Sequence, residues 1–229
     1  MIRYTKEKLD RLKYKFQECE KIDSNYSQAY QDMFVLTCLN GKRGGTYLEI
    51  GAYHSTSLSN TYLLESTFGW NGVSIDIEPS TSNSFNSDRK NPLIIANALT
   101  LDYKKILDES GFTKRIDYLQ LDIEPQDNTL ECLKRLPLDD YRFSVITYET
   151  DFYDPSFSRE RSLENREKSR EILKSKGYFL LVGNVCNVSN NDPFEDWYID
   201  PLVIDPGTLN WITPSEEYNM VSESILLNS

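Results

Sequence analysis

The sequence predicts one doubly wound α/β domain, with a mostly parallel sheet and helices on both of its faces. Three observations favour this fold. Strand and helix candidates alternate from residue 46 to residue 185 at the spacing of strand–helix–strand units. The first unit, residues 46–65, contains an apolar strand, a small-residue turn and a helix. Four strand candidates end on a carboxylate, at the edge where open α/β sheets bind their ligands.

The first elements are predicted to be helical. Leucine and phenylalanine recur at helical spacing among charged residues, which indicates a helix over residues 5–20. A second helix is expected from Ser27, as its N-cap, to Leu39. The glycines that follow end this helix and lead into the first strand.

The rest of the sheet is predicted from apolar runs that have turn-forming residues at both ends. Strands are expected at residues 46–50, 73–77, 92–96, 116–121, 143–148 and 178–185. Helices are expected between them at residues 57–66, 79–88, 103–110, 129–136 and 157–176. Residues 186–229 are rich in Asn, Asp and Pro and are interpreted as loop, with room for one further strand.

The chain is long enough for one main domain with additions at its ends. We expect an N-terminal helical extension (residues 1–25), the α/β domain (26–205) and a C-terminal tail (206–229) that packs on the domain or extends from it. No apolar run is long enough to span a membrane, and the N-terminal residues lack the apolar core of a secretory signal. A cytoplasmic location is therefore expected, whereas the oligomeric state does not follow from the sequence.

The four cysteines and the single histidine bear on redox state and metal binding. The cysteines are far apart and form no CxxC pair, at Cys19, Cys38, Cys132 and Cys186. Reduced, packed thiols are the expected state, and this residue set argues against structural zinc.

The net charge of −11 comes from 36 acidic and 25 basic residues. Proteins that grip nucleic acid through its phosphates normally present a basic face. Nucleic acid is therefore not the expected partner, and a small molecule or a neutral glycan is favoured.

The turn after the first strand is a candidate cofactor site. Gly51 permits a sharp turn and the close approach of a ligand, and Glu49 and Ala52 flank it. An acid at such a turn suits a cationic or hydroxyl-bearing ligand better than a pyrophosphate, which indicates S-adenosylmethionine rather than a dinucleotide. The alternative is that this glycine only makes a turn, as in many α/β proteins.

Residues after the second and third strands extend this candidate site. Asp76, with Glu78 close by, lies where doubly wound folds hold ribose hydroxyls with an acid. Asn97 can offer a donor and an acceptor to an adenine edge, although asparagine in a loop is also a common turn former.

Acids after the fourth and fifth strands are candidates for the chemistry. Asp122 and Glu124 face Glu149 and Asp151 if these two strands are neighbours. Asp122, Glu149 and Asp151 can hold Mg²⁺ or Ca²⁺ through hard oxygen ligands. Alternatively, Asp122, Glu124 or Glu149 can act as a general base toward a substrate hydroxyl. His54 is a further candidate base, because imidazole changes its charge near neutral pH, or else a surface-loop residue.

Glu195, Asp196 and Trp197 are candidate substrate-binding residues. Two acids beside an aromatic ring can bind a sugar, by hydrogen bonds to its hydroxyls and by stacking on its ring. The alternative is that this block packs the last strand against the sheet.

Seven blocks of the sequence together resemble the FkbM-type S-adenosylmethionine-dependent methyltransferases. The blocks are SQAYQD (27–32), TYLEIGAYHSTSLSNTYLLE (46–65), GWNGVSIDIEP (69–79), IDYLQLDIEP (116–125), FSVITYETDFY (143–153), SKGYFLLVGNV (175–185) and FEDWYIDP (194–201). The resemblance implies a Rossmann-like class I methyltransferase fold, with a seven-stranded sheet whose last strand is antiparallel. It also implies methylation of a hydroxyl group, commonly on a sugar or a secondary metabolite.

The resemblance also implies roles by position. Glu49 and Gly51 match the donor-binding loop of the family, and Asp76 or Glu78 matches its ribose contact. The acids after strands four and five match as well, at Asp122, Glu124 and Glu149. Two departures are that Tyr53-His54-Ser55 stands where many members have a small residue or glycine, and that Thr150 stands where many have histidine.

The sequence therefore predicts an O-methyltransferase that uses S-adenosylmethionine on a sugar, a glycan or a small metabolite. One alternative is a non-catalytic binding module on the same fold. Another is a metal-dependent enzyme that handles nucleotide sugars, in which the acids hold a metal ion and a diphosphate.

Overall fold

One sheet runs through the computed structural model, which describes residues 4–152, 157–186, 193–209 and 220–228. Its strands in the described residues are β1 (Thr46–Ile50), β2 (Asn71–Asp76), β3 (Leu93–Ile95), β4 (Arg115–Leu121), β5 (Arg142–Glu149), β6 (Phe179–Cys186), β7 (Pro193–Ile199) and β8 (Met220–Val221). They lie side by side in the order β3-β2-β1-β4-β5-β7-β6-β8. β7 is antiparallel to both of its neighbours, β5 and β6, and every other pairing is parallel.

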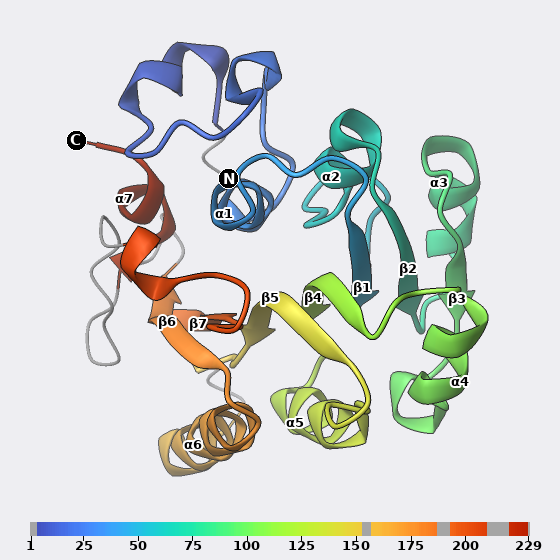
Figure 1. Cartoon of the computed structure of the whole chain (residues 1–229). Coiled ribbons are helices and arrows are strands. Elements are labelled where there is room, and N and C mark those ends of the chain that lie inside the picture. Colours follow the sequence, from blue (N-terminus) through green and yellow to red (C-terminus); the bar gives the residue numbers. More distant parts are fainter. Residues whose placement is uncertain (1–3, 153–156, 187–192, 210–219, 229) are drawn as a thin grey trace.

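Helices cover both faces of this sheet (Figure 1). They are α1 (Gln31–Cys38), α2 (Tyr62–Phe68), α3 (Thr81–Asp88), α4 (Tyr103–Glu109), α5 (Gln126–Arg135), α6 (Arg159–Ser175) and α7 (Ser222–Leu226). Short 3₁₀ turns are η1 (Lys6–Arg11), η2 (Cys19–Lys21), η3 (Ala98–Thr100) and η4 (Pro206–Leu209). α1, α2 and α7 lie on one face, and α4, α5 and α6 lie on the other. This is the doubly wound α/β fold that the sequence predicts.

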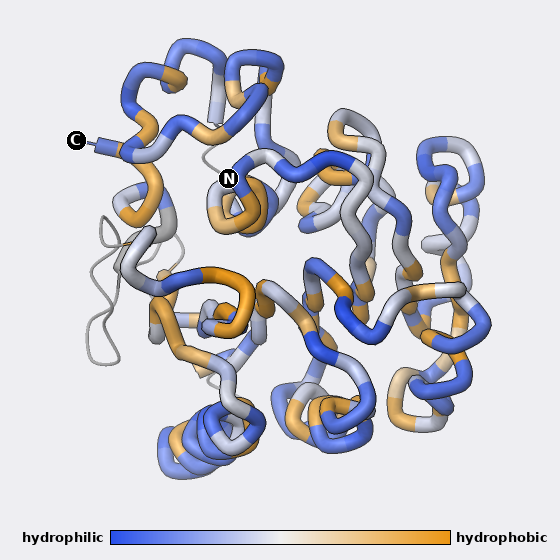
Figure 2. The backbone as a smooth tube through the Cα atoms, in the orientation of Figure 1, coloured by the Kyte–Doolittle hydropathy of each residue, from blue (hydrophilic) through white to orange (hydrophobic). Residues whose placement is uncertain are grey.

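Alternating side chains along each strand supply the two cores. On β1, Tyr47 packs in the cluster beneath α1 and α2, whereas Leu48 packs in the cluster above α4 and α5. Tyr118 and Leu119 divide in the same way on β4. Figure 2 shows the consequence for the helices, since α1 is largely apolar while α6 is largely hydrophilic. The alternation also fixes which face each acid at a strand end occupies.

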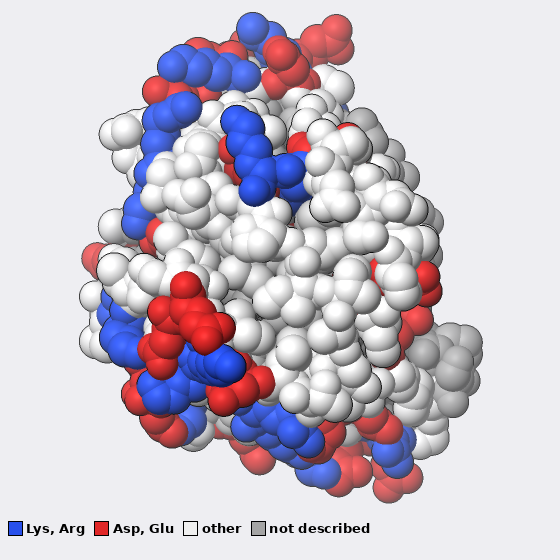
Figure 3. Space-filling model, turned by 90° about the vertical axis from the view of Figure 1, so that its right-hand side faces the viewer, with Lys and Arg blue, Asp and Glu red and all other residues white. Residues whose placement is uncertain are grey.

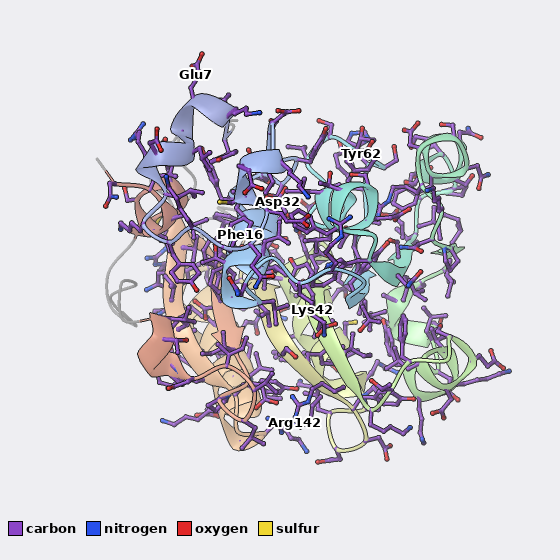
Figure 4. All side chains as sticks on the ribbon, turned by 45° about the horizontal axis from the view of Figure 1, so that its top comes forward. Glu7, Phe16, Asp32, Lys42, Tyr62 and Arg142 are labelled. Atoms are coloured by element: carbon purple, nitrogen blue, oxygen red, sulfur yellow. The ribbon has the colours of Figure 1, made fainter. Side chains whose placement is uncertain are left out.

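The predicted helix over residues 5–20 is wrong. The segment forms only the short turns η1 and η2, and Glu18 has a left-handed backbone with a φ of 64°. Its backbone groups pair with the C-terminal residues instead, because the Lys13 amide donates to the Leu226 carbonyl at 3.0 Å. Phe16 is buried against the domain while Glu7 is exposed to solvent (Figure 4). Tertiary contacts therefore replace the helix that the spacing predicts.

Two predicted helix starts are also too early. α1 begins at Gln31, because the Asp32 carboxylate accepts hydrogen bonds from the Ser27 hydroxyl and from the Tyr26 and Ser27 amides. Ser27 instead bridges to Leu58 in the loop after β1. α2 begins at Tyr62 and not at residue 57. The loop before each helix is thus longer than predicted, and both loops lie at one end of the sheet.

The C-terminal part contains more regular structure than the single strand that the sequence allows for. Besides β7, the described residues include η4, β8 and α7. The end of α7 shares a core with the N-terminal segment, since Leu226 and the following Leu227 pack in one cluster with Tyr4 and Leu12. None of the helices within the described ranges is both long and apolar enough to cross a membrane.

Candidate cofactor-binding site

A cavity of about 660 Å³ opens at the carboxyl ends of the parallel strands. Its lining comes from the carboxyl ends of β1, β2, β4 and β5 and from the segments that follow β1, β2, β3 and β4, together with Gln28 ahead of α1. The sheet order reverses between β1 and β4, so the cavity lies at the switch point where open α/β sheets hold ligands. The predicted cofactor residues Glu49, Gly51, Ala52, Asp76, Glu78 and Asn97 all line it, as do Asp122, Glu124 and Glu149.

Gly51 sits where the first turn approaches the end of β4. Its backbone has a φ of +86°, and a Cβ built on it would lie 1.6 Å from the Asp122 carbonyl oxygen. The left-handed backbone and the close Asp122 carbonyl oxygen each exclude a side chain at this position. The absence of a side chain lets the first turn and the end of β4 approach each other closely at the cavity wall.

Glu49 points to the face that α1 and α2 cover, because it alternates with Leu48 and Ile50 on β1. Its carboxylate accepts a hydrogen bond from the Ser74 hydroxyl at 2.6 Å. Burial raises the pKa of Glu49, while the Arg89 charge and the hydrogen bonds to Ser74 and Thr61 oppose that rise. A buried carboxyl group therefore forms part of the cavity wall beneath the first loop.

Asp76 shapes the loop beside β2. One carboxylate oxygen accepts from the Tyr53 amide at 2.7 Å, and the other accepts from the Glu78 amide at 2.7 Å. Each oxygen keeps a second lone pair, so Asp76 can still accept a ribose hydroxyl. Glu78 itself is exposed at the cavity mouth.

The part of the cavity beside β3 is the more apolar part. Ile77, Ala98 and Leu99 line it. The Asn97 side-chain oxygen accepts from the Leu99 amide at 2.9 Å, so Asn97 caps the turn η3. Its oxygen is thus held by the backbone, and its amide group is the part left to meet an adenine edge.

Asp122 and Glu149 lie side by side, because β4 and β5 are parallel neighbours with Leu121 opposite Tyr148. Burial raises the pKa of Glu149 well above its ordinary value, and the adjacent Asp122 carboxyl raises it further. Burial raises the pKa of Asp122 as well, which the hydrogen bond with Glu149 opposes. Both effects favour the protonated form of Glu149, whose hydrogen bond with Asp122 joins the two carboxyl groups. The predicted meeting of these two acids is correct.

Two of the predicted catalytic or metal-binding residues do not line the cavity. His54 is exposed and lies against the Tyr53 ring, with 4.0 Å between the ring centroids. Asp151 is buried past the end of β5 on a left-handed backbone, with a φ of 46°. In the described residues, no three His, Cys, Asp or Glu side chains gather in a way that could hold a metal ion. The structure thus corrects the placement of His54 as a base and of Asp151 in a metal cluster.

The prediction that Glu195, Asp196 and Trp197 bind a sugar is wrong on geometry. Trp197 is 0 % exposed and stacks on Phe34, with ring centroids 4.3 Å apart. Asp196 points to the opposite face of the sheet, where Arg170 donates to both of its oxygens. Glu195 is buried and accepts from the Trp197 indole at 2.6 Å. These residues hold the last strand in the core, which is the alternative that the sequence left open.

Four lining residues with amide side chains are absent from the sequence prediction, namely Gln28, Asn60, Gln120 and Asn128. Gln120 follows the alternation of β4 onto the same face as Tyr118, so strand periodicity could have found it. Gln28 and Asn60 come from loops joined by the Ser27–Leu58 bridge, and no local pattern indicates that pairing.

Arg89 holds the loop that carries Asn60. This buried guanidinium donates to the Ser55 carbonyl at 3.0 Å, to the Ser59 hydroxyl at 3.3 Å and to the Thr61 hydroxyl at 2.8 Å. It also pairs with Glu65 at 2.7 Å. Burial alone raises the pKa of Glu65, but the Arg89 charge lowers it below its ordinary value overall. The buried Arg89–Glu65 ion pair therefore fixes the loop that carries Asn60.

The cavity lining is acidic. Six carboxyl side chains line it, and no Lys, Arg or His is among the described lining residues. Such a wall attracts a cationic ligand and repels a diphosphate. On the face that Figure 3 shows, mixed charges gather at the two ends around a broad uncharged centre, and no continuous basic surface is present.

The residues present fit S-adenosylmethionine on two observations. Asp76 can accept ribose hydroxyls, and the acidic wall complements a sulfonium and an ammonium group. Apart from the added edge strand β8, the sheet, with β7 inserted antiparallel between β5 and β6, is that of the class I methyltransferase fold which the resemblance implies.

No family model matches the chain, and no curated protein matches it either, so the FkbM-type resemblance has no match of that kind behind it. Solved structures do match. Fibrillarin of Aeropyrum pernix, in complex with natively bound S-adenosyl-L-methionine, is 14% identical with a TM-score of 0.46, and the match covers 75% of this chain and 76% of that one. A methyltransferase of Pyrococcus furiosus is 13% identical with a TM-score of 0.46, over 73% and 80% of the two chains.

A fibrillarin pre-rRNA processing protein of Methanococcus jannaschii is 18% identical with a TM-score of 0.47, over 69% of this chain and 67% of that one. All three TM-scores lie below 0.5. The fold assignment therefore rests on the strand order and strand directions of this sheet itself.

Proposed function

We propose that this protein is an S-adenosylmethionine-dependent methyltransferase that methylates a hydroxyl group of a sugar, a glycan or a small metabolite. The observation that carries the proposal is the charge of the cavity, with six carboxyl groups and no cationic side chain among its described lining residues. Bound S-adenosylmethionine supplies an electrophilic methyl group on a sulfonium. An acidic wall at the switch point of this fold favours such a cation.

The residues divide the cavity into two functional parts. Asp76 accepts ribose hydroxyls, and Ile77 with Leu99 gives an apolar surface for the adenine ring. Asp122 and Glu149 lie on the other side of the switch point, where they meet the acceptor. The Asp122 carboxylate takes the proton of the acceptor hydroxyl, while the protonated Glu149 holds that carboxylate in place by its hydrogen bond to Asp122. Orientation of the acceptor oxygen can contribute about 7–11 kcal/mol to the rate enhancement.

The acceptor class is proposed from charge and from the resemblance. The blocks that resemble FkbM-type enzymes favour a hydroxyl acceptor. Hydroxyl groups also suit a wall of carboxyl groups, because carboxylates accept hydrogen bonds. A nucleic-acid acceptor is disfavoured, since phosphates are repelled by the acidic lining. The nucleotide-sugar alternative is weakened in the same way, because a diphosphate lacks both a cationic partner and a three-acid metal group among the described residues.

Calorimetry of S-adenosylmethionine binding tests the cofactor. We expect micromolar binding to the wild type, unchanged by EDTA or Mg²⁺. Asp76→Asn should weaken binding about tenfold or more, because a charge-assisted hydrogen bond to ribose contributes about 1.5–3 kcal/mol. Asp139→Asn is the matched control, since the Asp139 side chain is 86% exposed and pairs with Lys176 away from the cavity lining.

Three outcomes separate the hypotheses. Absence of S-adenosylmethionine binding to the wild type under every condition contradicts the proposal and favours a binding module of another kind. Mg²⁺-dependent binding of uridine diphosphate instead supports the nucleotide-sugar alternative. Methyl transfer to RNA, but not to a panel of mono- and oligosaccharides, contradicts the acceptor class while leaving the cofactor in place.

A further inference from the structure

Asn60 carries a buried acceptor with no partner. Its side chain lines the cavity, the residue is 6% exposed, and its Oδ1 atom has no hydrogen-bond donor within the described part of the chain. Among the described lining residues, it is the one with a buried polar atom left in this state. An amide oxygen that is buried without a donor destabilises the fold. A ligand that brings a donor to this atom removes that penalty.

The loop that carries Asn60 is held by hydrogen bonds on both sides of this residue. The residues on both sides of Asn60 are held by Arg89, which donates to the Ser59 and Thr61 hydroxyls. The Ser59 hydroxyl in turn accepts from the Tyr62 amide at 3.1 Å. Asn60 is therefore held in place by its neighbours while its own side-chain oxygen is left unpaired. Such a fixed and unsatisfied acceptor is preorganised for a ligand.

The position of Asn60 indicates which part of a ligand it meets. Asp76 and Asn97 follow β2 and β3, and this is the side proposed for adenosine. Asn60 comes from the loop between β1 and α2, beside Thr61, whose hydroxyl bonds to Glu49 on β1. Gln28 reaches the same cavity through the Ser27–Leu58 bridge. The amino-acid end of a nucleoside-linked ligand therefore lies near Asn60 when its adenosine lies near Asp76.

We propose that Asn60 recognises the α-ammonium group of the amino-acid part of the cofactor. The Oδ1 atom accepts one ammonium hydrogen, and Glu49, which lines the same cavity, favours the positive charge. This inference rests on the proposed function and adds a determinant of cofactor selectivity. It distinguishes S-adenosyl ligands that carry an amino-acid tail from thioethers of adenosine that lack one.

A pair of ligands and a pair of variants test this role. S-adenosylhomocysteine carries the ammonium group, whereas 5′-methylthioadenosine lacks the whole amino-acid tail. Asn60→Leu keeps the side-chain volume and removes the acceptor. It should weaken S-adenosylhomocysteine binding on the order of tenfold to hundredfold and leave 5′-methylthioadenosine binding within about twofold, as measured by calorimetry.

The second variant guards against a folding artefact. Asn60→Asp retains an acceptor oxygen and should bind S-adenosylhomocysteine within about threefold of the wild type. Asn86→Ala, an exposed asparagine on α3, is the control and should bind both ligands as the wild type does. Thermal unfolding of every variant shows whether the domain is intact.

Each result has a defined meaning. Equal weakening of both ligands by Asn60→Leu overturns the inference, because it indicates a general change in the loop. Unchanged binding of both ligands overturns it too, and in that case the proposed cofactor survives. Failure of the wild type to bind either ligand overturns both the inference and the proposed function. Selective loss of S-adenosylhomocysteine with recovery in Asn60→Asp supports the assignment.

Discussion

At the scale of single residues, Gly51 links the fold to the site. It has a left-handed backbone, and its missing side chain leaves room that the Asp122 carbonyl takes from the other side. The first turn and the end of β4 can meet only because this position is a glycine. The shape of the cavity at this point thus depends on the missing side chain of Gly51.

Gly51→Ala should destabilise the protein and abolish cofactor binding. The backbone conformation alone costs about 1–2 kcal/mol for a residue with a side chain. The contact with Asp122 should add about 1–3 kcal/mol, because backbone must shift to relieve it. Urea unfolding followed by circular dichroism measures the change in the free energy of unfolding.

Gly111→Ala is the matched control for that comparison. Gly111 has a φ of +70°, and a Cβ placed on it would meet nothing within 4 Å, so it tests the backbone cost without the contact. We expect a loss of about 1 kcal/mol there. Equal losses at both glycines would show that the approach to Asp122 is unimportant.

At the scale of elements, α6 docks on the sheet largely through polar contacts. Its buried residues include Ser162, Asn165 and Ser169, with Leu173 as the apolar member. Arg170 reaches the fully buried carboxylate of Asp196 on β7 with hydrogen bonds of 2.8 and 3.0 Å. This ion pair joins the helix to the antiparallel strand that defines the sheet order.

Arg170→Met should destabilise the protein by about 3 kcal/mol or more, because it leaves the Asp196 carboxylate buried without its cation. The control is Arg161→Met on the same helix. Arg161 pairs with Asp127 in an exposed position, so we expect a loss of at most about 1 kcal/mol. Chemical denaturation of both variants checks this, and similar losses would contradict a special role for the buried pair.

Elements with a local signal could be predicted from the sequence, and contacts between distant segments could not. The strand ends at Glu49, Asp76, Asp122 and Glu149 follow from apolar runs that end on acids, and all four line the cavity. The Arg89–Glu65 pair and the Ser27–Leu58 bridge join residues far apart in the chain. Arg89 holds Ser59 and Thr61 in the loop, so the second helix begins at Tyr62 and not at residue 57. The role of Asn60 could not be predicted for the same reason.

The substrate prediction at β7 failed because composition does not reveal which side of a strand faces a ligand. Trp197 and Asp196 alternate onto opposite faces, so one packs on Phe34 and the other meets Arg170. A pair of acids beside an aromatic ring has the residue types of a sugar site. The strand periodicity assigns both neighbours to the interior, where the register with β5 and β6 fixes them.

At the scale of the whole molecule, buried acids connect stability to pH. Burial raises the pKa of Glu195 from 4.5 to about 8, with hydrogen bonds from Trp197, Gln31 and Thr147 opposing the rise. The folded state therefore binds this proton more tightly than the unfolded state does. The contribution to stability is fully present below about pH 4.5 and declines as the pH rises to about 8.

Glu195→Gln should remove that part of the pH dependence. The amide is neutral at every pH and still accepts from the Trp197 indole, so the variant should gain stability relative to the wild type as the pH rises from about 5 to about 8. The gain should be on the order of a few kcal/mol. Urea unfolding at several pH values across this range measures it, and a constant difference between the two proteins would contradict burial of a protonated Glu195.

The pairing of the two end segments has a consequence for how the protein forms during synthesis. The Lys13 amide donates to the Leu226 carbonyl, the Asn228 amide donates to the Arg11 carbonyl, and Lys8 pairs with Glu223. Residues 8–13 leave the ribosome well before residues 223–228, yet they obtain these partners only after the later segment has emerged. Residues 8–13 are thus synthesised early but form these contacts late, after residues 223–228 have emerged.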